Sequence, residues 1–342
     1  MTAIPLIQLI SFGYLLDVAG KLTCGAKVSD AVRWRPAAGR IGLAVLALVL
    51  LGLPIRLLTH WATAAEIISP GTRQVGLLRG GAVLLTLLAM AHLSWAWARG
   101  GRLKYYFWPA PKQWLSQAWR PGTWLRSADA LFAMIRTFEI PRLFWLGTRG
   151  AIGTLIWLLP ATVIIAVNRN GKTGVAGLVG GVAFICLGIA LMYLPMLQAN
   201  FAADNRFRSM FAVKKIRSDF RRAPWAWLVA MVLTLVLLPI PLYLLKIEPP
   251  PRELIWLPTW FFIALMLPAR IASGLAMRRA RSKPEPSGAW AWISRFAVRV
   301  LIPPVVGVYL LFVYLSQYVS WDGLQTWVQQ HAVLVPVPFV GG

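Results

Sequence analysis

The side chains that could carry chemistry are few in this sequence and widely scattered. Eleven acidic residues and three histidines occur among 342 residues. None of the acidic residues lies near the centre of an apolar block, although ionisable residues at mid-membrane depth are the usual mark of transporters and intramembrane enzymes. His92 is the one titratable side chain set deep in a block, and a packed, hydrogen-bonded histidine is a more common role there than a proton relay. We therefore expect a protein that is not an enzyme.

Metal and cofactor chemistry has no supporting pattern either. Metal sites need clustered His, Cys or carboxylate ligands, and the three histidines and two cysteines are far apart along the chain. Cys24 lies in a basic segment and Cys186 in the middle of an apolar block, so no disulfide is predicted. The sequence indicates no metal site and no cofactor.

The composition places these residues in a membrane protein. Hydrophobic residues make up 58% of the chain and charged residues only 13%, about half the share of a soluble domain. The apolar residues form seven blocks of roughly the length that crosses a bilayer. These blocks are residues 39–59, 77–98, 150–167, 174–199, 225–245, 254–277 and 296–319. Because backbone groups in a bilayer need internal partners, the sequence predicts an all-α polytopic bundle of about seven spans, with amphipathic interfacial helices on its cytoplasmic face.

The basic residues predict the orientation of the spans. Lys and Arg are concentrated in alternate connecting segments, and none follows Trp321. Cytoplasmic loops retain positive charge, so we expect the N-terminus in the cytoplasm and the C-terminus outside. The predicted organisation is an N-terminal cytoplasmic interfacial segment over residues 1–38, a seven-span bundle with basic cytoplasmic loops over residues 39–319, and an external tail over residues 320–342.

The N-terminal segment has two interpretations. Residues 4–18 are apolar, but the stretch is short and contains Asp17. Lying in the interface costs less free energy than spanning the bilayer with a carboxylate, which favours an interfacial helix. An eighth span is the alternative.

Basic and aromatic residues gather on the predicted cytoplasmic face. Residues 108–150 and 201–223 are amphipathic and fit helices in the headgroup layer, where they either brace the bundle or recognise lipid. Trp-Ala-Trp occurs three times, each time near the cytoplasmic end of a span. One indole of each pair can face lipid and the other protein. The predicted lipid or partner contacts are Arg208, Lys214, Lys215, Arg217, Arg221, Arg222, Trp95, Trp97, Trp225, Trp227, Trp290 and Trp292.

Prolines and glycines inside the blocks allow a second interpretation. Prolines such as Pro160 and Pro195 interrupt the blocks, and broken helices facing a cavity are a transporter device, although membrane prolines usually only kink a helix. Glycines in the fourth block, including Gly177, Gly181 and Gly188, are predicted to allow close packing. The residues that could line a cavity are Arg56, His92 and Arg270.

The net charge of +24 indicates a negatively charged partner. Nucleic acid would be the usual partner in a soluble protein, but anionic headgroups attract the cytoplasmic cations of a membrane protein. The leading hypothesis is a non-enzymatic membrane protein whose basic, Trp-rich face binds anionic lipid or a cytoplasmic partner. We expect no nucleic acid as a partner. The cytoplasmic partner could also be a second copy of the chain, in a homo-oligomer. The alternative is a transporter or channel for an anionic or lipidic substrate.

Two short stretches resemble a domain-of-unknown-function family of prokaryotic multi-pass membrane proteins. One is Gly13-Tyr14-Leu15-Leu16. The other begins at Leu194-Pro195 and runs through Gln198-Ala199-Asn200-Phe201 to Arg206-Phe207-Arg208, where a span passes into a basic amphipathic helix. The resemblance covers the N-terminal segment and the fourth to sixth spans. It implies an inner-membrane location and transfers no catalytic or binding residues.

Overall fold

Only helical elements occur in the part of the chain that the structure describes. The computed structural model describes residues 5–32, 35–168, 173–241, 256–319 and 331–335. The long helices are α1 (Pro5–Thr23), α3 (Arg35–Ile68), α4 (Arg73–Ala98), α7 (Pro121–Thr137), α8 (Ile140–Asn168), α9 (Thr173–Asp204), α13 (Trp256–Ser282) and α14 (Ala289–Val319). The short ones are α2 (Val28–Ala31), α5 (Leu103–Phe107), α6 (Pro111–Gln117), η1 (Phe207–Phe211), α10 (Val213–Arg222), α11 (Pro224–Val232), η2 (Leu233–Leu237) and η3 (His331–Val333). The predicted all-α fold is confirmed.

Several helices can span a membrane. By length and hydropathy, six segments qualify among the described residues: Gly39–Ile68, Arg73–Ala98, Pro121–Ile164, Gly177–Asp204, Pro224–Pro241 and Ala289–Leu315. They correspond to six of the seven predicted blocks, so the chain is an integral membrane protein of polytopic helical type. α13 occupies most of the seventh block, residues 254–277, but is not among the six. The number of seven spans stays a prediction.

The chain forms two compact units, which are described separately. The first unit comprises residues 1–32 and 140–342, and the second comprises residues 33–139. The predicted division into residues 1–38, 39–319 and 320–342 concerns membrane topology and stays a prediction, but by contacts residues 1–32 group with residues 140–342. The reason is packing, because α1 contacts α8, α9 and α13 and therefore belongs with the C-terminal part of the chain.

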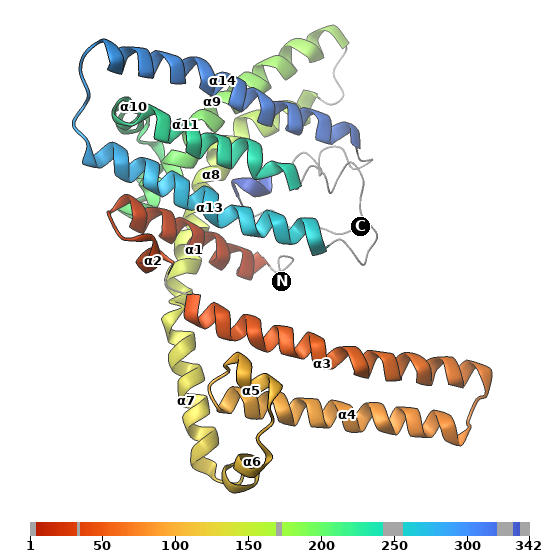
Figure 1. The fold of residues 1–342 in the computed structure, drawn as a ribbon. Coiled ribbons are helices and arrows are strands. Elements are labelled where there is room, and N and C mark those ends of the chain that lie inside the picture. Colours follow the sequence, from red (N-terminus) through yellow and green to blue (C-terminus); the bar gives the residue numbers. More distant parts are fainter. Residues whose placement is uncertain (1–4, 33–34, 169–172, 242–255, 320–330, 336–342) are drawn as a thin grey trace. The chain divides into compact units, whose positions relative to one another are not determined.

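Helix α1 is a packed element of the first unit (Figure 1). That it lies in the membrane interface, or spans as an eighth helix, stays a prediction. Leu16, Val18 and Leu22 are fully buried. The interfacial prediction depended on the cost of Asp17 in an apolar helix. In the structure Asp17 forms ion pairs with Arg142, at 2.8 Å, and with Lys21, and a paired carboxylate can be accommodated in a packed bundle.

Glycines bring α1 into backbone contact with its neighbours. A Cβ atom added at Gly13 would lie 1.9 Å from the carbonyl oxygen of Leu143, and one added at Gly147 would lie 2.0 Å from that of Leu9. Only glycine fits such an approach. The predicted close packing through the fourth block is wrong for Gly177 and Gly181, since an added Cβ there meets no described atom within 4 Å. At Gly188 it meets only side-chain atoms, at 3.6 Å and beyond.

The second unit is a helical hairpin followed by three further helices. α3 and α4 run side by side (Figure 1) and are joined at Gly71, whose φ of +72° suits glycine. Leucines and valines such as Leu48, Val49, Leu84 and Leu87 are more than half exposed along the hairpin. Apolar side chains of this kind contact lipid tails in a bilayer.

A π-helical turn accommodates one of the predicted proline breaks. Helix α11 continues directly into η2, a π turn over Leu233–Leu237, and the backbone N–H of Leu238 donates to the carbonyl of Leu233 at 3.1 Å. Pro239 follows and has no N–H to donate. The wider turn keeps the chain helical up to this proline, so the break is a local adjustment and not an open gap in the helix.

The C-terminal segment, which the sequence predicts to be an external tail, contains a buried turn. The side of the membrane on which it lies stays a prediction. His331, Val333, Leu334 and Val335 are each at most 3% exposed and pack within the first unit. Residues 320–330 and 336–342 of the predicted tail lie outside the described residues. The turn is buried because its apolar side chains enter the core while its carbonyl groups accept hydrogen bonds from Arg270 and Gln198.

Candidate functional site

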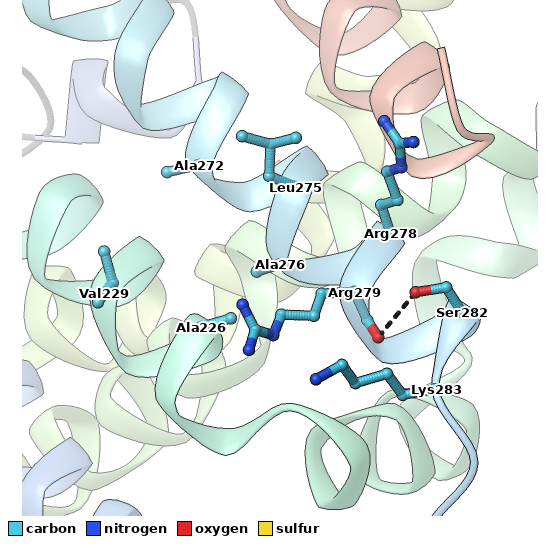
Figure 2. Close-up of a pocket in the computed structure, with 9 residues that line it drawn as sticks. All are labelled: Ala226, Val229, Ala272, Leu275, Ala276, Arg278, Arg279, Ser282 and Lys283. Atoms are coloured by element: carbon cyan, nitrogen blue, oxygen red, sulfur yellow. Dashed lines mark hydrogen bonds between the residues drawn. The ribbon is translucent and has the colours of Figure 1, made fainter. Parts of the chain in front are cut away.

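The first unit contains a groove between α11 and α13 (Figure 2), with a volume of about 640 Å³. Both helices are apolar along the sides that form it. Its lining residues are Ala226, Val229, Ala272, Leu275, Ala276, Arg278, Arg279, Ser282 and Lys283. The groove therefore has apolar walls and a strongly basic end, where α13 finishes.

The walls of the groove are made by small and branched apolar side chains. Ala226 and Val229 come from one side and Ala272 and Ala276 from the other. Val229 is 57% exposed and Leu275 38% exposed. An alanine pair leaves room that a larger side chain would fill, so an extended apolar chain can lie against these residues.

The cations at the end of the groove differ in their partners. Arg278 donates to the carbonyl of Ala26 at 3.2 Å and holds the loop after α1. Arg279 and Lys283 have no side-chain hydrogen bond or ion pair with any described residue, and Figure 2 shows both side chains extending toward the α11 side of the groove. Two cations that have no side-chain partner among the described residues thus lie where the apolar walls end.

Helix α10 carries many of the predicted contact residues. Arg208 on η1 and Lys214 on α10 are exposed. Lys215 pairs with Asp204 at 2.9 Å, and Arg217 donates to the Tyr193 hydroxyl at 3.0 Å. Lys215 and Arg217 therefore already interact with other side chains of the protein. Of these four predicted contact residues, Arg208 and Lys214 are the two without such a stated interaction.

The C-terminal end of α10 also has internal partners. Arg221 lies 3.9 Å from Glu285, and Arg222 is half-buried. Asp219 is 5% exposed, and its Oδ2 atom has no hydrogen-bond partner in the described part of the chain. Burial raises the pKa of the Asp219 carboxyl, against the opposing effect of nearby Arg281, Lys215 and Arg222.

The three Trp-Ala-Trp pairs differ in how far protein covers their two indole rings. Trp225 is 51% exposed while Trp227 is 2% exposed. Trp290 and Trp292 are 80% and 65% exposed, so neither is covered by protein. Trp95 is 1% exposed, and with Trp97 it lines a pocket of the second unit. The difference follows from packing, because Trp290 lies in the first turn of α14 and has few neighbours.

A buried polar cluster occupies the interior of the first unit. Arg270 is 3% exposed; its guanidinium donates to the Oε1 atom of Gln198 and, at 3.4 Å, to the carbonyl of Val333. The amide of Gln198 donates to Thr154 Oγ1 at 2.7 Å and to the carbonyl of Leu334 at 2.8 Å. Both of the acceptors of Arg270 are neutral. Within the described residues, the charge of Arg270 is therefore balanced by dipoles.

The other two predicted cavity residues belong to the second unit. Arg56 is exposed on α3. His92 on α4 is partly buried, and its Nε2 atom contacts the carbonyl of Tyr106 at 2.8 Å. This is the packed, hydrogen-bonded role expected for His92 from the sequence. Of the three, Arg270 is the one that the structure buries.

The chain was compared with protein families, curated proteins and solved structures. Residues 132–247 match the family described as protein of unknown function, DUF4013. The comparison with curated proteins found no match, and the comparison with solved structures found none. The resemblance to a family of unknown function is thereby confirmed, but its extent differs from the prediction.

The DUF4013 match has a definite place in the fold. It begins within α7 and extends through α8, α9, η1, α10, α11 and η2. The stretch from Leu194 to Arg208 lies inside it, whereas Gly13-Tyr14-Leu15-Leu16 and α13 lie outside. The DUF4013 region supplies the α11 wall of the groove and Gln198 of the buried cluster, while the cations Arg279 and Lys283 come from beyond it.

The sequence did not predict that the groove residues form a binding site. Arg278, Arg279 and Lys283 are visible in the sequence only as topology-setting cations. The run of cations that follows the apolar residues Ala272–Met277 was the available signal, but pairing with α11 could not be deduced from it. Among the described residues, no group of three or more His, Cys, Asp or Glu side chains is placed to hold a metal ion.

Proposed function

We propose that this protein is a non-enzymatic membrane protein that binds an anionic phospholipid in the α11–α13 groove. One observation carries the proposal: Arg279 and Lys283, which have no described side-chain partner, stand at the end of an apolar groove. The headgroup would contact these cations, and an acyl chain would lie along Ala226, Val229 and Ala272.

The physical chemistry of the groove suits a molecule with one charged end. Each Lys or Arg near an anionic headgroup contributes about 1 kcal/mol, and each buried CH₂ group contributes about 0.8 kcal/mol. A soluble anion would use only the first contribution, and a neutral lipid only the second. An anionic phospholipid uses both, which is why we prefer it to a soluble ligand.

The wider basic face supports the same proposal. Arg208 and Lys214 are exposed on the predicted cytoplasmic side, where they would raise the local concentration of anionic lipid without forming a site. A cytoplasmic protein partner on this face is the competing outcome. It predicts that a second protein, and not a lipid, accompanies the purified chain in fixed proportion.

The experiment measures lipids retained by the purified protein. The full chain is reconstituted in nanodiscs of phosphatidylcholine with a minor fraction of phosphatidylglycerol, and bound lipid is identified by native mass spectrometry. Two cations at about 1 kcal/mol each correspond to roughly a 30-fold change in affinity. We therefore expect Arg279→Gln with Lys283→Gln to lower retained phosphatidylglycerol by about that factor.

Two further variants make the result specific. Arg206→Gln with Lys27→Gln removes the same charge from exposed positions outside the groove and is expected to change retention little. Ala272→Phe keeps both cations but fills the groove, and should lower retention. If the control pair lowers retention as much as the groove pair, the attraction is a general one and the proposed site is wrong.

The buried Arg270 cluster favours transport of an anion as a second candidate function. A guanidinium surrounded by neutral acceptors could bind a passing anion, provided that water reaches it. Thr154, which accepts from Gln198, is 0% exposed. In a background with Cys24 and Cys186 replaced by serine, Thr154→Cys should react with a water-soluble thiol reagent if the transport candidate is correct, and complete protection in lipid would exclude it.

A further inference from the structure

The second unit contains a pocket of its own, with a volume of about 300 Å³. It lies where the end of α4, the start of α3 and the end of α6 meet one side of α7, all within residues 33–139. Among the residues that line it are Arg40, Trp95, Trp97, Arg99, Arg126 and Ser127. Three of them are arginines, and none of these lining residues is acidic.

Local backbone structure places the first arginine of this pocket. α4 ends at Ala98 and is followed by Arg99-Gly100-Gly101, in which both glycines have positive φ angles, +108° and +63°. Such angles turn the chain sharply and are readily adopted only by glycine. The turn brings α5 back over the helix end, so that Nη2 of Arg99 donates to the carbonyls of Tyr105 at 2.9 Å and Trp108 at 2.7 Å.

Two buried donors of the pocket residues have no acceptor. The Nε atom of Arg99 and the Nε1 atom of Trp95 are buried without a hydrogen-bond partner among the described residues. A buried donor left without an acceptor lowers stability, because its hydrogen bond to water is lost and not replaced. Burial also lowers the pKa of Arg99, against the opposing effect of nearby Tyr105. An acceptor with negative charge would relieve both costs.

The remaining lining residues favour an anion as well. Arg126 uses its Nε atom to donate to the carbonyl of Gly122 at 3.0 Å, which orients its side chain. Ser127 supplies a hydroxyl group, while the Thr123 hydroxyl donates to the carbonyl of Gln117 at 3.0 Å. Thr123 lies in the first turn of α7, where the helix dipole is positive. Arg40 of α3 adds a third guanidinium. Guanidinium groups are the side chains best suited to bind phosphate oxygens.

We infer that this pocket binds a phosphate-bearing anion through Arg40, Arg99 and Arg126. The volume admits inorganic phosphate or a small phosphate ester, and Trp97, Leu131 and Met134 give an ester an apolar surface. The phosphate group can come from a soluble molecule or from a lipid headgroup. The inference is independent of the proposed lipid groove, since the two sites share no residue.

The test uses the full chain in a detergent free of phospholipid. Binding of inorganic phosphate and of glycerol phosphate is measured by isothermal titration calorimetry, and phosphatidylglycerol is tested separately in nanodiscs. Saturable binding of a soluble probe supports a soluble source. Saturable binding that occurs only with the lipid, and that responds to the pocket variants, supports a headgroup. Absence of saturable binding for all three probes would overturn the inference.

Variants distinguish the pocket from general charge attraction. Arg40→Gln with Arg126→Gln should weaken binding at least tenfold, and Trp95→Phe, which keeps a ring but removes the indole N–H, should weaken it several-fold. Arg136→Gln removes a cation from the same helix outside the pocket and should have no effect. An equal loss in Arg136→Gln would refute the site. The groove variant Arg279→Gln with Lys283→Gln should leave phosphate binding unchanged, so the two sites can fail separately.

Discussion

Arg270 and Gln198 are 72 positions apart in the sequence, and their side chains hydrogen-bond in the buried interior of the first unit. Gln198 uses its amide to reach Thr154 and the carbonyl of Leu334, so it connects three helical elements to the C-terminal turn. A buried cation is tolerated only where its donors are satisfied. The pair therefore determines where the turn of residues 331–335 docks.

Replacing Gln198 should destabilise the first unit. Gln198→Leu removes the acceptor of a buried guanidinium, and the loss of a hydrogen bond to a charged group costs about 1.5–3 kcal/mol. We expect a clear fall in the thermal unfolding midpoint in detergent, followed by tryptophan fluorescence. Gln113→Leu, at an exposed position of α6, is the matched control. An unchanged midpoint in Gln198→Leu would mean that the cluster is not structural.

Adding a methyl group at the α1–α8 crossing should separate these helices. In Gly13→Ala or Gly147→Ala the new Cβ would meet a backbone carbonyl oxygen at about 2 Å, and backbone cannot move aside as a side chain can. Overpacking of this kind costs about 1–3 kcal/mol or more. The measurement is again the unfolding midpoint, compared with Gly181→Ala, which has open space. Equal midpoints for the two crossing variants and the control would contradict the packing of α1.

Asp219 should make stability depend on pH with a defined sign. Burial raises the pKa of its carboxyl in the folded protein above the unfolded value, so the folded state binds the proton more tightly. The contribution to stability is then complete below the unfolded pKa and is lost as pH rises through the folded pKa. Asp219→Asn stays neutral, so its midpoint should fall less than that of the unmodified protein between pH 4 and pH 7. Asp30→Asn, on the exposed surface of α2, is the control, and a steeper fall in Asp219→Asn would refute the prediction.

The predicted orientation can be tested with single cysteines. In the background lacking Cys24 and Cys186, Lys214→Cys and Arg73→Cys each place a thiol at an exposed position. The positive-inside pattern predicts that a membrane-impermeant reagent labels Arg73→Cys in intact cells, and labels Lys214→Cys only after permeabilisation. The reverse pattern would place the N-terminal side outside and would invert every loop assignment.

The apolar blocks could be predicted well from the sequence because the bilayer restricts the choices. A long apolar segment must satisfy its own backbone groups, and only a helix does so within one segment. Six of the seven blocks correspond to helices long and apolar enough to span. The hydrogen-bonded role of His92 was also predictable, since a lone histidine in an apolar helix needs a nearby acceptor.

The position of α1 could not be predicted, because the bilayer gives no hydrophobic reason for one helix to contact another. Helices in lipid associate through close packing and polar contacts, which depend on residues distant in the sequence. Gly13 matters only because Gly147 and Leu143 face it, and Asp17 is acceptable only because Arg142 reaches it. None of these three partner residues can be deduced from the sequence of the N-terminal segment.

The candidate sites, like the position of α1, depend on contacts that the sequence does not specify locally. The sequence by itself determined that this is a basic, helical membrane protein, because charge and hydropathy act on each segment separately. Only the tertiary structure decided that Arg279 and Lys283 border an apolar groove, that Arg99 and Arg126 share a pocket, and that Arg270 holds the C-terminal turn. Such groupings depend on which helix faces which, and that is set by packing across long sequence separations rather than by local pattern.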